Sequence, residues 1–435
     1  MLTRRSVLAA AAVPVFGRAP SLPTPSPRQL RWHALETTAF LHFGINTFTG
    51  KEWGYGDENP NLFQPAHFDA GAILAPLADA GMRGVILTCK HHDGFCLWPT
   101  ATTDHCIRAS SWRGGKGDVV RDVADAARRR GLLFGVYLSP WDRNNPHYGT
   151  PRYIEIYRRQ LTELLTGYGD IFEVWHDGAN GGDGFYGGAR EKRIIDKRTY
   201  YDWPGTWALV RRLQPGAVIF SDVGPDLRWV GNERGIAGDP CWATYDPVAP
   251  DGGPAAPGDV RAKESATGYR HGSHWMPAEC DVSIRPGWFW HQDQNARVKT
   301  PAQLIDLYYQ SVGRGANLLL NVPPNRDGLL SAEDMASLHG FGEYRRRTFA
   351  HPVPRGAEFN VIRVREDIRY GQRIDEAVVE VSNGRAWEQI ANVTSIGPRR
   401  LVRLGRRMRA QKLRLRVLKS SAPPKIAEVA AFLET

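Results

Sequence analysis

Short apolar segments that alternate with amphipathic ones constrain the fold of this chain more than any other feature. From residue 37 onward, near-continuously apolar runs, typical of buried parallel strands, mostly alternate with segments of helical periodicity. The strand candidates are 40–46, 84–90, 133–140, 171–178, 217–224, 226–232, 275–284 and 316–324. The helix candidates are 70–81, 118–131, 153–169, 206–216, 301–313 and about 331–347.

Roughly eight β/α repeats at this chain length predict a (β/α)8 barrel. A doubly wound sheet is the second choice, but no G-x-G-x-x-G follows a strand and the chain has no P-loop. After about residue 350 the helical period disappears, and "NVIRVRE", "AVVEVS" and "KLRLRV" alternate polar with apolar residues. This alternation predicts a small antiparallel β-sandwich. We therefore expect a barrel domain over 31–349 and a C-terminal sandwich over 350–435.

The first twenty residues, "MLTRRSVLAAAAVPVFGRAP", have the pattern of an export signal. Arg4 and Arg5 precede a short apolar run and then small residues, which makes the signal twin-arginine-like. We expect a signal over 1–19, a linker over 20–30, and a periplasmic or secreted bacterial protein; a frayed cytosolic N-terminus is the alternative. No stretch reaches the ~18–20 apolar residues of a membrane span.

The net charge of +10 raises the question of an anionic partner. Much of it lies in "PRRLVRLGRRMRAQKLRLRV", residues 398–417. Lys412, Arg414 and Arg416 alternate there with apolar residues, which is the pattern of a strand with one solvated face. We therefore expect no nucleic-acid partner, with a nucleic-acid or anionic-glycan patch as the alternative.

Cysteine and tryptophan usage limits the remaining classes of site. The five cysteines are too few and too irregularly spaced for a disulfide scaffold or a CxxC zinc site, so we expect them to be buried small residues. The 14 tryptophans fit either the size of the chain or sugar binding, because an indole face stacks on the C–H face of a pyranose ring.

Active sites of such barrels lie at the C-terminal ends of the strands. The side chains at these ends are aromatic, histidine-rich and carboxylate-rich, as a polyhydroxylated substrate would require. They are His42, Glu52, Trp53, His91, His92, Asp93, Tyr137, Trp141, Asp142, Trp175, Asp177, Asp222, Glu233, Glu279, Trp288 and Asn321.

The segment "FEVWHDGANGG", 172–182, places Glu173, Trp175 and Asp177 on one face of a strand, since side chains alternate. Asp177 falls at the mouth of the barrel, where an ionised carboxylate can attack the anomeric carbon of a sugar. A second carboxyl group about 5–5.5 Å away would then protonate the leaving oxygen, as in retaining glycosidases. The alternative for Asp177 is a helix N-cap or turn residue before Gly178.

The segment "KHHDGF" offers two adjacent histidines, His91 and His92. They could bind substrate hydroxyls, hold a metal, or serve the structure alone. Adjacent side chains point to opposite sides of a strand unless the strand has ended, and no H-E-x-x-H motif completes a metal site. We expect sugar binding, with no metal and no cofactor.

Seven segments, in this order, resemble the α-L-fucosidases of glycoside hydrolase family 29. They run from about residue 31 to 345 and read "FLHFGINTFTGKEWG", "CKHHDGFCLW", "GVYLSPWD", "EVWHDGANG", "RWVGNERG", "ECDVSIRPGWFW" and "GRGANLLLNVPPNRDG". The resemblance implies a retaining exo-enzyme that removes terminal α-L-fucose from fucosylated oligosaccharides or glycoconjugates. It also implies a covalent intermediate on Asp177. Where this chain has His176 the family commonly has an apolar residue, and we expect that side chain to face away from Asp177.

The resemblance further implies the roles of the other site residues. The "RWVGNERG" segment is similar to the subfamily acting on α-1,3/1,4-linked fucose and makes Glu233 the acid/base, with Glu279 as its rival or as a binding residue. Broader specificity including α-1,2/1,6 linkages, a catalytically silent fucose-binding protein and a metal-dependent hydrolase are the alternatives. The implied fucose-pocket residues are His42, Glu52, Trp53, His91, His92, Tyr137, Trp175 and Trp288. The C-terminal segment weakly resembles discoidin-like β-domains, for which a packing role is expected before glycan binding.

Overall fold

The computed structural model of this chain describes residues 22–434, so the predicted export signal over 1–19 lies outside the described residues. Eight parallel strands close into a barrel in the order β1-β12-β11-β8-β7-β4-β3-β2. The strands are β1 (Thr37–Leu41), β2 (Gly84–Lys90), β3 (Leu133–Leu138), β4 (Glu173–Trp175), β7 (Val218–Ser221), β8 (Leu227–Trp229), β11 (Ala278–Ser283) and β12 (Asn317–Asn321). The barrel prediction is confirmed and the doubly wound sheet is wrong.

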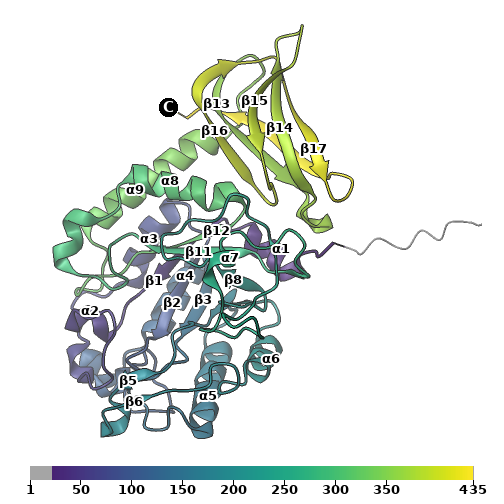
Figure 1. Cartoon of the computed structure of the whole chain (residues 1–435). Helices are drawn as coiled ribbons and strands as arrows, with labels where there is room; N and C mark the ends of the chain where they lie inside the picture. Colours follow the sequence, from purple (N-terminus) through teal and green to yellow (C-terminus); the bar gives the residue numbers. More distant parts are fainter. Residues whose placement is uncertain (1–21, 435) are drawn as a thin grey trace, which may run out of the picture.

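Helices surround the strands, as Figure 1 shows, and each helix predicted from periodicity is present. Side-chain oxygens of Asp69, Asp118, Asp202 and Thr300 cap the N-termini of four of them. The long helices are α3 (Ala70–Asp79), α4 (Val119–Arg129), α5 (Pro151–Gly167), α6 (Trp203–Leu213), α8 (Pro301–Gln310) and α9 (Ala332–Phe349). Shorter elements are α1 (Pro27–His33), α2 (Ile45–Thr49), α7 (Ala262–Ser265), β5 (Gly182–Gly184), β6 (Glu191–Arg193), β9 (Thr244–Tyr245) and β10 (His274–Trp275).

The first strand is shorter than predicted. The apolar run 40–46 suggests a strand throughout, but β1 ends at Leu41 and α2 begins at Ile45. Phe43 is buried outside the barrel, where its ring packs against Phe63 and Phe68 at centroid distances of 5.4 and 5.7 Å. An apolar run can thus leave the sheet and still be buried. His42 consequently lies just beyond the strand end.

The barrel interior has its own core, and α1 contributes to it. Trp32 of α1 packs with Phe40, Tyr137, Trp175 and Phe220 inside the ring of strands. Its indole Nε1 donates to Glu173 Oε2 at 3.1 Å. The larger apolar core lies between the strands and the surrounding helices. Helix α1 thus supplies an aromatic side chain to the interior beneath the C-terminal strand ends.

A β-sandwich follows the barrel, as predicted. Two three-stranded antiparallel sheets, β16-β13-β18 and β15-β14-β17, enclose a core that includes Phe359, Ile362 and Val379. Figure 1 shows this sandwich beside α8 and α9. Its strands are β13 (Glu358–Glu366), β14 (Ile374–Ser382), β15 (Glu388–Val393), β16 (Arg400–Arg409), β17 (Lys412–Ser420) and β18 (Ile426–Phe432). The predicted boundary at 349/350 falls in the connection between α9 and β13.

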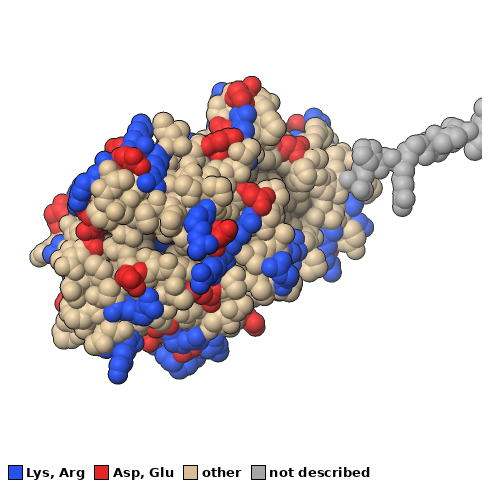
Figure 2. Space-filling model, turned by 90° about the horizontal axis from the view of Figure 1, so that it is seen from below, with Lys and Arg blue, Asp and Glu red and all other residues tan. Residues whose placement is uncertain are grey.

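Basic residues of the sandwich form ion pairs. Three of them lie 2.6 Å from acidic side chains of the barrel: Arg399 with Glu36, Arg400 with Asp239, and Arg403 with Asp306. Along β17 exposed and half-buried residues alternate, which confirms the strand with one solvated face. Arg414 and Arg416 both contact Glu380, each at 2.7 Å. Figure 2 shows basic and acidic side chains interspersed on the face seen from below.

All five cysteines are free and buried, as expected. Within residues 22–434, no helix has both the length and the apolar character that a membrane crossing requires.

A buried lysine connects the end of β2 to the helical layer. The Lys90 ammonium contacts Asp142 Oδ2 at 3.1 Å, Tyr153 Oη at 3.1 Å and Gln160 Oε1 at 2.9 Å. Tyr153 and Gln160 lie on α5, and Asp142 lies in the loop after β3. Both charged side chains of the pair are at most 2% exposed. This contact anchors the strand end from which His91 and His92 follow.

We predict that Lys90→Met lowers the free energy of unfolding by about 3–5 kcal/mol, because it leaves the Asp142 carboxylate buried without its cation. Urea unfolding followed by circular dichroism measures this change. Arg152→Ala is the control, since it breaks only the exposed pair with Glu155 and should change stability far less. Equal stabilities of the two variants would contradict the prediction.

Candidate active site

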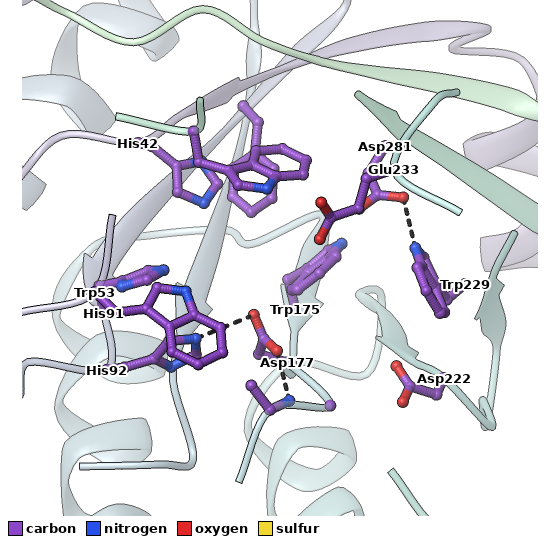
Figure 3. A pocket seen from close by; sticks show the side chains of 14 residues that line it. His42, Trp53, His91, His92, Trp175, Asp177, Asp222, Trp229, Glu233 and Asp281 are labelled. Carbon is purple, nitrogen blue, oxygen red and sulfur yellow. Dashed lines mark hydrogen bonds and ion pairs between the residues drawn. The ribbon is translucent and has the colours of Figure 1, made fainter. Parts of the chain in front are cut away.

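A cavity of about 240 Å³ opens at the C-terminal ends of the barrel strands (Figure 3). This is below the roughly 300–1,000 Å³ of pockets for drug-sized ligands and suits a single sugar ring. Its lining residues are Phe40, His42, Trp53, His91, His92, Trp175, Asp177, Gly178, Ala179, Asp222, Trp229, Glu233, Asp281 and Trp288. Of the catalytic and fucose-pocket residues that the resemblance implies, Glu52, Tyr137 and Glu279 do not line it. The other strand-end candidates outside the lining are Asp93, Trp141, Asp142 and Asn321.

The segment after β4 places two predicted residues in the cavity. Trp175 ends the strand and Asp177 follows two residues later, so both side chains point to the same side. His176 between them faces the helical layer, where its Nδ1 lies 2.9 Å from the Tyr157 hydroxyl of α5. The prediction that His176 points away from Asp177 is thus confirmed.

Both carboxylate oxygens of Asp177 accept hydrogen bonds. Tyr137 Oη donates to Oδ2 at 2.9 Å, and the Ala179 backbone N–H donates to Oδ1 at 2.7 Å. Burial raises the pKa of Asp177, while these two donors oppose the rise. The result is a fixed carboxylate that still faces the cavity, as Figure 3 shows. The bond from the Ala179 N–H is the turn contact expected of an Asp in this position. Asp177 therefore forms the turn and also lines the cavity.

The two adjacent histidines both reach the cavity because β2 has ended at Lys90. Ser139 Oγ donates its one proton to the Trp141 carbonyl at 2.7 Å, so it accepts from His92 Nδ1, also at 2.7 Å. Burial lowers the pKa of His92 to about 3. The neutral ring therefore presents its Nε2 lone pair to the cavity, 3.9 Å from Asp177 Oδ2.

His42 is arranged in the same way. Asn321 Nδ2 donates to the Trp288 carbonyl at 2.8 Å, which orients the amide so that its Oδ1 accepts from His42 Nδ1 at 2.9 Å. Burial lowers the pKa of His42 to about 3. His42 Nε2 is therefore a hydrogen-bond acceptor in the cavity, as His92 Nε2 is. Burial also lowers the pKa of His91. Neutral imidazole acceptors match the hydroxyl donors of a sugar.

Glu233 extends into the cavity from the segment after β8, and Figure 3 shows its carboxyl group beside Asp281. Burial raises the pKa of Glu233, a hydrogen bond from Trp288 lowers it, and the charges of Asp177 and Glu52 raise it further. Asp281 is buried and accepts from Trp229 Nε1 at 2.8 Å. Burial, followed by the charge of Glu233, raises the pKa of Asp281. On balance the surroundings of Glu233 favour its protonated form.

Glu279 lies beneath the cavity. It is fully buried on β11, and its Oε2 accepts from Trp175 Nε1 at 3.1 Å. Trp175 lines the cavity, so Glu279 contacts the cavity wall through that indole rather than lining the cavity itself. The sequence left Glu233 and Glu279 as rivals for the acid/base role. In the structure Glu233 lines the cavity, whereas Glu279 lies beneath it.

Glu52 also acts from outside the lining. Its Oε2 accepts from the Trp288 backbone N–H at 2.8 Å, and its Oε1 contacts His291 Nε2 at 2.9 Å. A Cβ added to Gly287 would lie 2.2 Å from Glu52 Oε1, so a larger residue there would displace the Glu52 carboxylate. Glu52 thus ties the loop after β1 to the segment that supplies Trp288.

Asp222 lines the cavity from the end of β7 and accepts from the Gly258 backbone N–H at 2.8 Å. Burial raises the pKa of Asp222 to about 6, opposed by this hydrogen bond, and the Asp177 charge adds to the rise. Any Cβ on Gly178 would approach Asp222 Oδ2 to 2.2 Å. The glycine after the Asp177 carboxylate is therefore needed for the close approach of these two segments.

Phe40, Trp229 and Asp281 line the cavity but were not predicted to do so. Side-chain alternation along a strand could have predicted two of them. Phe40 precedes His42 by two residues and Asp281 follows Glu279 by two, so each is expected on the same face as a predicted site residue. For Trp229 the only signal was its place in the "RWVGNERG" segment.

No group of three or more His, Cys, Asp and Glu side chains within residues 22–434 is arranged to hold a metal ion. The arrangement offers a hydrogen-bonded carboxylate, a partly buried second carboxyl group, imidazole acceptors and indole walls. These are the groups needed to bind one sugar and to cleave its glycosidic bond by acid/base chemistry.

Comparison with known proteins identifies the family. Residues 28–348 match the model of the α-L-fucosidase family. The chain is 41% identical to α-L-fucosidase 1 of Arabidopsis thaliana, covering 95% of this chain and 88% of that protein. It is 42% identical to a crystal structure of a glycoside hydrolase 29 family member from an unknown rumen bacterium, with a TM-score of 0.89 over 96% of this chain and 78% of that one.

A Ruminococcus gnavus glycoside hydrolase 29 fucosidase, solved in complex with fucose, is 28% identical. The match has a TM-score of 0.82 and covers 96% of this chain and 97% of that one. The family model and the plant relative together cover the barrel and its cavity. This chain therefore belongs to the α-L-fucosidases of glycoside hydrolase family 29 and is an α-L-fucosidase.

Proposed function

We propose that this enzyme is a retaining exo-α-L-fucosidase in which Asp177 is the nucleophile and Glu233 the acid/base. The observation that carries the proposal is that both carboxyl groups enter one small cavity while Glu279 lies beneath it. Tyr137 and the Ala179 N–H orient Asp177. The raised pKa of Glu233 suits a group that must hold a proton until the leaving oxygen takes it.

In the first step Asp177 attacks the anomeric carbon and Glu233 protonates the departing glycosidic oxygen, which forms a fucosyl ester on Asp177. In the second step Glu233 removes a proton from a water molecule, which displaces Asp177 and releases fucose. Tyr137 stabilises the carboxylate that departs in this second step, because it already donates to Oδ2.

The substrate is a terminal α-L-fucosyl residue of a fucosylated glycan. His42 Nε2 and His92 Nε2 accept hydrogen bonds from the sugar hydroxyls, and Trp53 and Trp288 form walls around the sugar ring. The relative solved with fucose supports a site for one such sugar. The similarity of "RWVGNERG" to the α-1,3/1,4 subfamily supports a preference for these linkages, with broader specificity as the alternative.

We also propose that residues 1–19 export the enzyme to the periplasm or medium and that residues 20–30 form a linker. This proposal rests on the sequence of those residues, of which 1–21 lie outside the described part of the chain. The barrel domain over 31–349 and the sandwich domain over 350–435 complete the proposed organisation.

Asp177→Gly should reduce the release of fucose from an aryl fucoside by at least about a thousandfold, because it removes the carboxylate that forms the proposed covalent intermediate. Azide should restore turnover and give a fucosyl azide of inverted anomeric configuration, identified by NMR. Circular dichroism checks that the variant is folded. Wild-type turnover in the folded variant would refute the assignment.

Glu233→Ala should lower kcat/KM on a natural fucosylated glycan far more than on fucosyl fluoride, because fluoride leaves without a proton. Glu279→Ala is the matched comparison, since it removes a carboxyl group that does not line the cavity. Its losses should be similar on both substrates. The reverse pattern would move the acid/base role to Glu279.

The pH profile of kcat/KM should be bell-shaped, because Asp177 must be ionised and Glu233 protonated. Activity is lost as the pH falls through the raised pKa of Asp177 and as it rises through the raised pKa of Glu233. Glu52→Gln removes a negative charge that raises the pKa of Glu233 and should move the alkaline limb to lower pH. An alkaline limb that stays in place would contradict this coupling.

A further inference from the structure

Two glutamates lie buried in the barrel interior beneath the cavity, and neither touches the proposed substrate site. Glu173 is on β4 and Glu279 on β11, and both residues are 0% exposed. Each uses one oxygen in the same way. Trp32 Nε1 donates to Glu173 Oε2, and Trp175 Nε1 donates to Glu279 Oε2, both at 3.1 Å.

The second oxygen of each carboxyl group, Oε1, is buried without a donor from the described residues. The two carboxyl groups lie within hydrogen-bonding contact of each other. Among the described residues, the ion pairs in which both side chains are fully buried are Lys90–Asp142 and Arg285–Asp334, and neither includes Glu173 or Glu279. An ionised carboxylate only accepts hydrogen bonds, so two such oxygens can bond to each other only if one carries a proton. Two buried carboxylates without a cation cannot both remain ionised.

We propose that Glu173 and Glu279 share one proton between their Oε1 atoms and that this pair positions Trp175 in the cavity wall. The part about Trp175 rests on the proposed function, whereas the shared proton does not. Burial and the neighbouring Glu279 carboxyl group raise the pKa of Glu173, and burial raises that of Glu279, which agrees with retention of a proton.

The pair connects to the proposed nucleophile through aromatic rings. The Trp175 ring stacks on Phe220 with centroids 4.1 Å apart and on Tyr137 with centroids 5.4 Å apart. Tyr137 in turn donates to Asp177. With one proton, the pair keeps a negative charge that strengthens the bond from the Trp175 indole. Loss of that proton would leave two carboxylates that repel each other. Their repulsion would move Glu279 away from the Trp175 indole.

The surrounding titratable groups oppose loss of the shared proton. Asp226 acts on Glu173 from the turn between β7 and β8, and its carboxylate is paired with Arg28 and Arg211. Asp281 lies two residues beyond Glu279 on the same strand, and its own pKa is raised by burial. Both are acidic, so any charge that they carry opposes removal of the shared proton.

Infrared difference spectroscopy at neutral pH tests the shared proton without any substrate. The carbonyl stretch of a protonated carboxyl group should be present in the wild type and lost in Glu173→Gln, because the new amide N–H then donates to an ionised Glu279. Glu279→Gln should lose the same band, and the double variant should lose nothing more. Glu380→Gln is the control, since Glu380 is paired with two arginines and should contribute no such band.

A double variant that loses a second protonated band would mean two protons in the pair and would overturn the proposal. Single variants that keep the wild-type band would mean none and would overturn it as well.

Kinetics test the positioning of Trp175. Glu279→Met leaves the Trp175 indole without an acceptor and should lower kcat about tenfold, the equivalent of one lost hydrogen bond of about 1.4 kcal/mol. Glu279→Gln keeps an acceptor oxygen and should recover kcat to within about threefold of the wild type. Equal kcat values for the two folded variants would refute the positioning role. Azide rescue of Asp177→Gly tests the proposed nucleophile independently, so the two failures are distinguishable.

Discussion

Closure of the parallel barrel is the constraint on which the rest of this structure depends. Because all eight strands run the same way around a closed ring, their C-terminal ends meet at one rim. His42, His91, Asp177 and Glu233 are far apart in the sequence, and the ring brings them to one cavity. Buried contacts such as those of Lys90 with Asp142 and α5 connect this ring to the helical layer.

Burial then determines the charge states in and beneath the cavity. The same desolvation that keeps His42 and His92 neutral raises the pKa of Asp177, Glu233 and Asp281. Hydrogen bonds from Tyr137 and the Ala179 backbone oppose this rise in pKa at Asp177. The mechanism proposed above requires one ionised and one protonated carboxyl group, and an unequal distribution of hydrogen-bond donors can provide both within one enclosed site.

The residues outside the lining supply the support for this site. Glu52 holds the segment that carries Trp288, and Glu279 holds Trp175. The glycines at 178 and 287 allow the close approach of carboxylates that any larger residue would displace. The β-sandwich contributes in a different way, because its arginines pair with acidic residues of the barrel that do not line the cavity.

Local patterns in the sequence determined the elements and many of the residues at the rim. Alternation of apolar strands with amphipathic helices predicted the barrel, and the spacing of two between Trp175 and Asp177 predicted their common face, because both patterns depend on neighbours along the chain. The early end of β1, the depth that separates Glu233 from Glu279, and the pairing of Glu279 with Glu173 could not be predicted in this way. They depend on how segments pack that are distant in sequence, and only the tertiary structure decides which side chains that packing exposes, buries or brings into contact.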